Sequence, residues 1–318
     1  MNTETAIPMK TQGKWAQAWK RQLRLYAQHK MLLLMLLPGF LLFFLFQYVP
    51  LYGISIAFKD FQIKEGILGS PWIGFEHFDR LFAGDGFSNA FRNTIIIALL
   101  KLVITFPAPI VLAIMLNEVR HGWFRRAVQT VSYLPHFFSW VILAGIMFTF
   151  LGTDGAFNQL ISVFGLEKHN WLLESANFYG IVLISSIWKS VGWGSIVFFA
   201  ALSSIDPTLY EAAIADGAGR WRRIWHITLP GIAPTIIIML LMDIGHLLSV
   251  GFDQIYNLTT PTTSDVADIL DTYVLRRLLT MDYGLGAAAG IFSSIIGLAL
   301  VMLGNRAVKL FDKEQGLW

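Results

Sequence analysis

Four ionisable side chains within long apolar stretches are the residues of this sequence best suited to chemistry. They are Lys101, Lys189, Asp243 and His246. A charge in an apolar environment is costly, so such residues usually serve binding, proton transfer or pairing. Asp243 and His246 are three positions apart, would share one helix face, and could relay protons. Lys189 could neutralise an acidic ligand, and Lys101 could extend along its helix to reach water. The alternative for each is a structural contact between helices or subunits.

No other pattern in the chain suggests catalysis. The phosphate-binding pattern G-x-x-x-x-G-K-[ST] and the zinc-binding pattern H-E-x-x-H are absent, and the seven histidines are scattered. The chain has no cysteine, which excludes disulfides, thiolate catalysis and cysteine-based metal sites. We therefore expect no catalytic residue, no metal and no cofactor on this chain, and a membrane enzyme is disfavoured.

The composition indicates a membrane protein. The 318 residues are 55% hydrophobic and 14% charged, with a mean hydropathy of +0.57, whereas soluble domains average about 25% charged residues. The net charge of +3 is too small to argue for nucleic acid. Nearly charge-free runs that are long enough to cross a membrane as helices occur at residues 31–56, 91–116, 128–151, 177–203, 228–250 and 284–304. The predicted fold is therefore all-α, with six transmembrane helices.

Lysine and arginine indicate which side each loop faces. They are concentrated in residues 1–30, near 117–127, in the loop 204–230 and in the tail 305–318, whereas the alternate loops hold few. By the positive-inside rule, both termini and the loop 204–230 are expected to be cytoplasmic. The chain then divides into an N-terminal segment, a transmembrane domain over 31–304, and a cytoplasmic tail.

The pattern of residues 1–30 predicts an amphipathic helix that lies along the membrane surface. Trp15, Trp19, Leu23 and Tyr26 recur at helical spacing among lysines and arginines, which is typical of interfacial helices. A cleaved signal peptide is the competing interpretation. It is disfavoured because the basic region and the apolar run that follows are both too long.

The loop 204–230 has the pattern of two short helices separated by a turn. Asp206 is a plausible N-cap and Pro207 a first helical residue, which predicts a helix to about Ala215. Two glycines then break the helix, a second helix starts near Trp221, and Pro230 is expected to start the next membrane segment. Such an exposed pair of helices suits docking. An ordinary cytoplasmic loop with a basic anchor at anionic lipid is the alternative.

The same loop resembles the EAA signature of binding-protein-dependent ABC importer permeases. The residues that carry the likeness are Glu211-Ala212-Ala213, Asp216-Gly217-Ala218 and Leu229-Pro230. The resemblance implies the type I ABC importer permease fold, in which this loop forms coupling helices that sit in a cleft of an ATPase subunit. It makes Glu211 the first choice for an ion pair with the ATPase. The expected coupling residues are Glu211, Ala212, Ala213, Asp216, Gly217, Ala218, Arg220 and Pro230.

The resemblance extends over nearly the whole chain. Tyr48–Gly53, Val131–His136, Ile187–Trp193, Asp271–Arg276 and the terminal Gly-Leu-Trp look like the permeases of polysaccharide and oligosaccharide importers. The likeness implies a bacterial inner-membrane protein that pairs with a second, homologous permease. It also implies two ATPase subunits that bind ATP and magnesium, and an extracytoplasmic solute-binding protein. Sugar would then cross by alternating access between the two permeases.

A sugar cavity would need aromatic rings for stacking and polar groups for hydrogen bonds. If the sugar were acidic, such as a uronate oligomer, Lys189 could supply a counter-charge. The residues interpreted as the solute path are Trp188, Lys189, Trp193, Asp243, His246, Asp253 and Asn257. The external loops at about 59–90 and 252–283 are acidic and aromatic, which fits either ordinary solvated loops or a contact surface for the binding protein.

An ion-coupled secondary transporter of a small solute is the main alternative function, because Asp243 and His246 could carry protons. Such a carrier works without an ATPase, whereas an importer permease is inert alone. The sequence has no internal repeat of the kind that many secondary transporters show.

Overall fold

The computed structural model describes residues 29–311, which are mostly helical and contain no β-strand. Residues 1–28, which hold most of the predicted amphipathic helix, and residues 312–318 lie outside that range. The α-helices are α2 (Lys30–Phe43), α3 (Gly66–Gly69), α4 (Glu76–Ala83), α5 (Asp85–Leu100), α6 (Pro107–Glu118), α7 (Gly122–Tyr133), α8 (Trp140–Leu151), α9 (Ala156–Ser162), α10 (Ser175–Ser203), α11 (Pro207–Ala215), α12 (Arg220–Arg223), α13 (Leu229–Gly245), α14 (Phe252–Leu258), α15 (Ser264–Ala267), α16 (Leu270–Leu279) and α17 (Tyr283–Phe311).

Six helical segments among the described residues are long and apolar enough to cross a membrane, which confirms the predicted number of spans. They are Lys30–Phe58, Gly86–Glu118, Trp140–Ser162, Ser175–Ser203, Arg220–Gly245 and Tyr283–Arg306. Met1–Ser55 and Ile56–Trp318 form two separate compact units. In the first unit, the large apolar side chains of α2 are exposed, which suits contact with lipid.

Three of the described spans contain a wide π-helical turn, and each turn stands just before a proline. The turns are Phe44–Tyr48, Lys101–Thr105 and Ile224–Thr228, and the prolines are Pro50, Pro107 and Pro230. Proline has no N–H to donate, and its ring crowds the carbonyl one turn earlier. We attribute the wide turns to this crowding, which they relieve without ending the helix.

The third apolar run is not one helix, which corrects the prediction of a continuous span over 128–151. Between α7 and α8 the α-helix stops, because Leu134–Phe137 form a single 3₁₀ turn and residues 138–139 are not helical. Pro135 has no backbone donor with which to continue α7. Ser139 caps α8, because its side chain accepts the N–H of Ile142 at 3.4 Å. The run is apolar throughout, but the α-helix within it is not continuous.

The fifth apolar run is also interrupted. The sequence predicts a helix over 228–250, but α13 ends at Gly245 and α14 starts at Phe252. The residues between them, 246–251, are called the α13–α14 break below. Backbone that leaves a helix at membrane depth needs hydrogen-bond partners from the protein itself. This break therefore requires donors from neighbouring elements.

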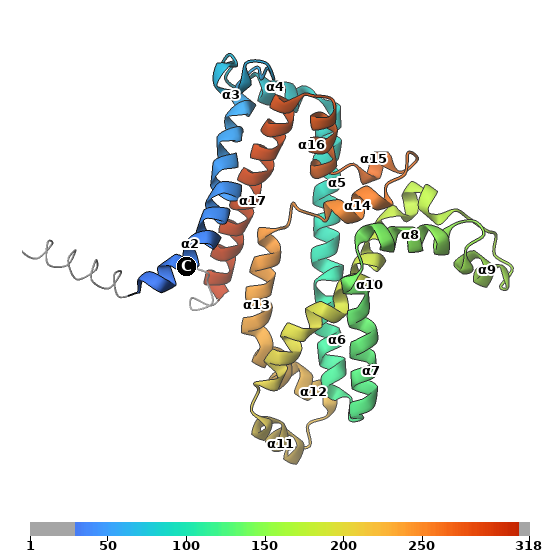
Figure 1. Cartoon of the computed structure of the whole chain (residues 1–318). Coiled ribbons are helices and arrows are strands. Elements are labelled where there is room, and N and C mark those ends of the chain that lie inside the picture. The colour runs from blue at the N-terminus through green and yellow to red at the C-terminus, as the bar shows by residue number, and fades with distance from the viewer. Residues whose placement is uncertain (1–28, 312–318) are drawn as a thin grey trace, which may run out of the picture. The chain divides into compact units, whose positions relative to one another are not determined.

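The long helix α10 is at the centre of the second unit (Figure 1). One buried cluster joins it to α6 and α13 through Ile110, Phe198 and Ile232. A second cluster joins α10 to α5 and α14 through Val182, Ile97 and Ile255. A third cluster packs α4, α16 and α17 together around Leu81, Tyr273 and Ala288. The short helices α11 and α12 lie at the opposite end of this unit from α4 and α16 (Figure 1).

Helix α10 crosses α7 at a very close backbone approach. A Cβ atom at Gly192 would overlap the backbone of Ser132 and Tyr133. Backbone cannot move aside as the end of a flexible side chain can, so only glycine fits at this crossing. This contact fixes α7 against α10 directly before the interruption at residues 134–139.

Replacing Gly192 by alanine should lower the thermal stability of the purified protein in detergent. Overpacking of this kind costs about 1–3 kcal/mol. Gly180→Ala is the matched control, because Gly180 is on the same helix and an added Cβ meets no atom within 4 Å. Equal unfolding temperatures for the two variants would show that α7 and α10 do not approach this closely.

Candidate functional site

The loop 204–230 contains the helix that the sequence predicts. α11 starts at Pro207, and the Asp206 carboxylate caps it by accepting the N–H of Thr208 at 2.9 Å. This bond lowers the pKa of the Asp206 carboxyl, because it favours the charged form. The helix ends where Gly217 adopts a φ of 75°, a conformation that glycine reaches at no steric cost. The predicted bounds and cap of α11 are confirmed.

The next membrane segment starts earlier than predicted. We expected Pro230 to begin it, but α12 starts at Arg220 and continues through the π-helical turn into α13. The candidate fifth span accordingly runs over Arg220–Gly245. Pro230 therefore lies inside a continuous helical segment, where the π-helical turn Ile224–Thr228 before it accommodates the proline.

The loop is fastened to the helical bundle by two side-chain contacts. The Arg220 guanidinium Nε lies 2.7 Å from Oε2 of Glu118, the last residue of α6. The Tyr210 hydroxyl lies 3.0 Å from the hydroxyl of Thr228, which is buried in the π-helical turn. Arg220 therefore makes an ion pair within its own chain. The sequence predicts a contact of this residue with the ATPase or with lipid.

The outer face of the loop remains exposed. Glu211, Ala212, Asp216 and Gly217 are exposed, while Ala213 and Ala218 are half-buried. Large apolar side chains are exposed beside them, at Leu209, Ile214 and Trp221. An acid among exposed apolar side chains on a short, well-capped helix is typical of a surface that docks a protein partner.

Lys101 points into the protein and does not extend to water, which corrects one of its two interpretations. Its ammonium donates to the carbonyl oxygen of Val250 at 2.6 Å and to Oε1 of Gln254 at 2.6 Å. Val250 belongs to the α13–α14 break, so Lys101 supplies a donor that the interrupted helix needs. The lysine itself stands at the start of the π-helical turn Lys101–Thr105.

Gln254 is the functional candidate that sequence reasoning missed. It is buried, and its Oε1 also accepts the Ser186 hydroxyl at 2.9 Å. Its Nε2 donates to the carbonyl of Val182 at 2.7 Å and to the hydroxyl of Ser185 at 2.9 Å. One amide thus joins α10, α14 and the second span with all its donors used. The available signal was a glutamine three residues after a glycine, within an apolar region.

Asp243 lies in the last turn of α13, and His246 follows the end of that helix as the first residue of the α13–α14 break. The Nδ1 atom of His246 lies 2.9 Å from the carbonyl of Met242. Both residues line a cavity of about 180 Å³ together with Lys101 and Ser249. Two of the predicted path residues therefore come together around the interrupted helix.

Lys189 donates hydrogen bonds to the interruption between α7 and α8, at residues 134–139. Its ammonium donates to the carbonyls of His136, at 3.1 Å, and Phe138, and lies 5.3 Å from the centroid of the Trp140 ring. Trp193 stacks on the His136 ring with 4.5 Å between centroids. The structure supports the interpretation of Lys189 as a contact between helices, within residues 134–139 and α10.

The remaining predicted path residues lie elsewhere. Trp188 lines an apolar groove of about 720 Å³ between α8 and α10, with Ile146 and Phe150 on its other side. Asp253 and Asn257 are neighbours on α14, where the Asn257 amide donates to the Asp253 carbonyl at 2.7 Å. The seven predicted path residues are therefore spread over the 134–139 interruption, the α13–α14 break, the apolar groove and α14.

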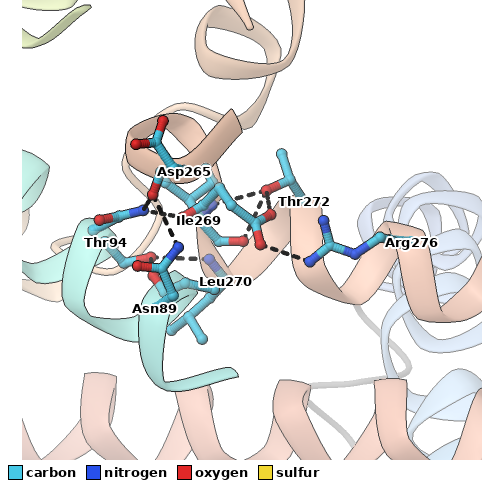
Figure 2. Close-up of polar contacts among 10 residues, drawn as sticks. Asn89, Thr94, Asp265, Ile269, Leu270, Thr272 and Arg276 are labelled. Atoms are coloured by element: carbon cyan, nitrogen blue, oxygen red, sulfur yellow. Dashed lines mark hydrogen bonds and ion pairs between the residues drawn. The ribbon is translucent and has the colours of Figure 1, made fainter. Parts of the chain in front are cut away.

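Part of the acidic loop after α14 is engaged within the chain. The Asn89 amide on α5 donates to the Asp265 carbonyl at 2.9 Å (Figure 2). The Asn93 amide on the same helix donates to that carbonyl at 2.8 Å. The Asp268 carboxylate accepts Arg276 at 2.6 Å and the Thr272 hydroxyl at 2.8 Å. These contacts hold the loop against the second span, so Asp268 is a structural residue of the 252–283 loop.

Six apolar spans, an exposed polar loop at 204–230, and polar residues beside interrupted helices suit a membrane transport subunit. The chain belongs to the family described as binding-protein-dependent transport system inner membrane component, whose model matches residues 105–316. It is therefore an inner-membrane permease of an ABC importer. The family predicted from the EAA loop is confirmed.

Full-length relatives support the same assignment. The chain is 47% identical to the polygalacturonan/rhamnogalacturonan transport system permease protein YteP of Bacillus subtilis (strain 168), over 93% of this chain and 92% of that protein. It is 44% identical to protein LplB of the same organism, over 96% of both. It also resembles a chain in the crystal structure of a bacterial ABC transporter involved in the import of the acidic polysaccharide alginate. That match has a TM-score of 0.86 and 42% identity, and covers 92% of this chain and 99% of that one. The predicted permease fold is confirmed.

Replacing Lys101 by methionine should destabilise the protein in detergent by about 1–3 kcal/mol, because the Val250 carbonyl and Gln254 lose their charged donor. Gln254→Leu should destabilise it similarly, and the double variant should lose less than the sum, since both belong to one network. Lys64→Met is the control, because Lys64 is exposed. Thermal unfolding measures all four variants. A Lys101→Met variant as stable as this control would contradict the network.

Asp271 should make stability depend on pH. It is half-buried beside Ser293 and Ser294, and burial raises the pKa of its carboxyl above the ordinary 3.8. The folded protein then holds this proton more tightly than the unfolded chain does. Its contribution to stability therefore falls as pH rises from 3.8 through the raised pKa.

Asp271→Asn should accordingly flatten this dependence and unfold at a higher temperature than the unmodified protein at neutral pH. Unfolding temperatures recorded from about pH 4 to 7 test this, because that interval covers a carboxyl with a raised pKa. Asp60→Asn, at an exposed carboxyl, serves as control. If the unfolding temperature changed equally with pH in all three proteins, the pH dependence would belong to groups other than Asp271.

Proposed function

We propose that this chain is one of two permeases in an ATP-driven importer of acidic oligo- or polysaccharides. The observation that carries the proposal is its full-length likeness to a permease chain of an alginate importer, with a TM-score of 0.86 at 42% identity. YteP, at 47% identity, carries polygalacturonan and rhamnogalacturonan in its name. These named substrates contain uronic acids, so the shared chemistry is a chain of sugars that bear carboxylates.

The proposed assembly holds a second, homologous permease and two ATPase subunits, which bind ATP and magnesium. An extracytoplasmic binding protein delivers the sugar, and a related alginate importer has been crystallised with its pentasaccharide-bound periplasmic protein. Both termini and the loop 204–230 face the cytoplasm in this proposal. The distribution of lysine and arginine among the loops supports that orientation.

The proposed mechanism is alternating access. ATP closes the two ATPase subunits, the exposed face around Glu211 and Ile214 follows them, and the membrane helices change their arrangement. Such coupling needs an element with two states that is biased from both of its ends. The α13–α14 break is the proposed element, because interrupted helices in transporters commonly line the solute site. Asp243, His246, Asp253 and Asn257 then lie at or beside the path.

Glu211→Lys should abolish coupling while the membrane bundle stays folded. The assay reconstitutes this chain with the second permease, the ATPase and the binding protein from the same genome, and supplies oligogalacturonate. We expect sugar-stimulated ATP hydrolysis to fall by at least about tenfold, because reversing one member of an interfacial ion pair leaves its partner unpaired. Glu167→Lys, at an exposed acid outside this loop, is the control and should keep the stimulation.

Two outcomes would contradict the proposal. Transport in vesicles by this chain alone, without ATP, would make it a secondary carrier and direct attention to Asp243 and His246. Stimulation by neutral malto-oligosaccharides as strong as by oligogalacturonate would remove the preference for acidic sugars.

A further inference from the structure

Arg220 and Glu118 each occupy an unfavourable position on their own helix. Arg220 is the first residue of α12, at the positive end of a helix dipole, and Glu118 is the last residue of α6, at the negative end of another. The two charges meet at 2.7 Å. Each charge offsets the electrostatic cost of the other, which indicates a contact between two specific helix ends and not a chance encounter of surface charges.

The second span is one continuous helical segment that connects Glu118, beside the loop 204–230, with Lys101, beside the α13–α14 break. It runs over Gly86–Glu118 and includes the π-helical turn Lys101–Thr105. Lys101 in that turn donates to Val250 of the α13–α14 break. A displacement of Glu118 along this helix would therefore reach the interrupted fifth span. The other connection from the loop, through Arg220–Gly245, reaches the same break from its opposite side.

We propose that the Arg220–Glu118 ion pair is a strut that makes the second span move together with the coupling loop. Both are positioning residues, because they would act through their contact with each other. The proposal rests on the proposed function, in which an ATPase docks on this loop. With the strut in place, the loop moves both membrane segments that meet at Val250; without it, the loop moves only the fifth span.

The pair should matter for coupling more than for stability. Arg220 is 58% exposed and Glu118 is 23% exposed at their side chains. Ion pairs with this much exposure contribute little to folding. A loss of coupling without a loss of thermal stability is therefore the signature that separates a strut from an ordinary surface ion pair.

Charge reversal and exchange test the strut in the reconstituted complex. Arg220→Glu and Glu118→Arg, each alone, should reduce sugar transported per ATP hydrolysed by at least about fivefold, the lower limit for a coupling between sites. The unfolding temperature should stay unchanged. The double variant, Arg220→Glu with Glu118→Arg, restores the pair with both charges at favourable helix ends and should recover most of the coupling.

Arg120→Glu is the matched control, because Arg120 lies two residues after Glu118 and outside the loop 204–230, is exposed, and has no ion pair among the described residues. It should leave coupling as in the unmodified protein. Single variants that couple normally, or a double variant no better than the singles, would overturn the strut.

A cross-link provides a second, independent test. The chain has no cysteine, so Glu118→Cys with Arg220→Cys introduces its only two thiols. Joined by a short bifunctional thiol reagent, the two segments should still support ATP-driven transport if they move as one body. Arrest of transport by the cross-link would show that the pair opens in each cycle, which overturns the proposal. Failure of the unmodified complex to depend on ATP would instead remove the proposed function, and the strut with it.

Discussion

The structure depends on finding hydrogen-bond donors for backbone that leaves its helix within the membrane. Lipid offers none, so an interruption is tolerated only where side chains of the protein reach it. Two lysines do this in the same way. Lys101 donates to Val250 in the fifth span, and Lys189 donates to His136 and Phe138 before the third. Each ammonium has three protons and a flexible stem, which suits it to capping irregular carbonyls. Lys101 and Lys189, which the sequence suggests as solute or helix contacts, thus donate to carbonyls where the helices are interrupted.

Helices that bend without breaking complement these two interruptions. The π-helical turns before Pro50, Pro107 and Pro230 keep their spans continuous, because a wider turn relieves the crowding by proline. The turn before Pro107 also carries Lys101, so one irregularity positions the residue that stabilises another. The close approach at Gly192 fixes α7 beside α10. Movement is then easiest where the chain is irregular, and least where α10 packs against α6 and α13.

A closely packed set of helices with irregular segments beside it suits a permease. The loop 204–230 is held by contacts within the chain, because Asp206 caps α11 and Tyr210 contacts Thr228. It presents exposed apolar and acidic residues on its outer face, while Arg220 and Thr228 attach it to two different spans. Those spans meet at the α13–α14 break through Lys101 and Gln254. An arrangement of this kind can pass a displacement of the loop to the α13–α14 break, provided both states satisfy the same backbone groups.

The sequence alone determined the class, the number of spans, the family and the bounds of helix α11, because these depend on local properties. Hydropathy over twenty residues reports a span, and an aspartate before a proline reports a helix start. The interruptions at 134–139 and 246–251 were missed, since apolar composition does not record where hydrogen bonds stop. The roles of Lys101, Lys189 and Arg220 were also decided only by tertiary structure. Each contacts a partner distant in sequence, at Val250, His136 and Glu118. Residue type limits what such a side chain can donate, but only the packing of α6, α10 and α13 determines which acceptor it reaches.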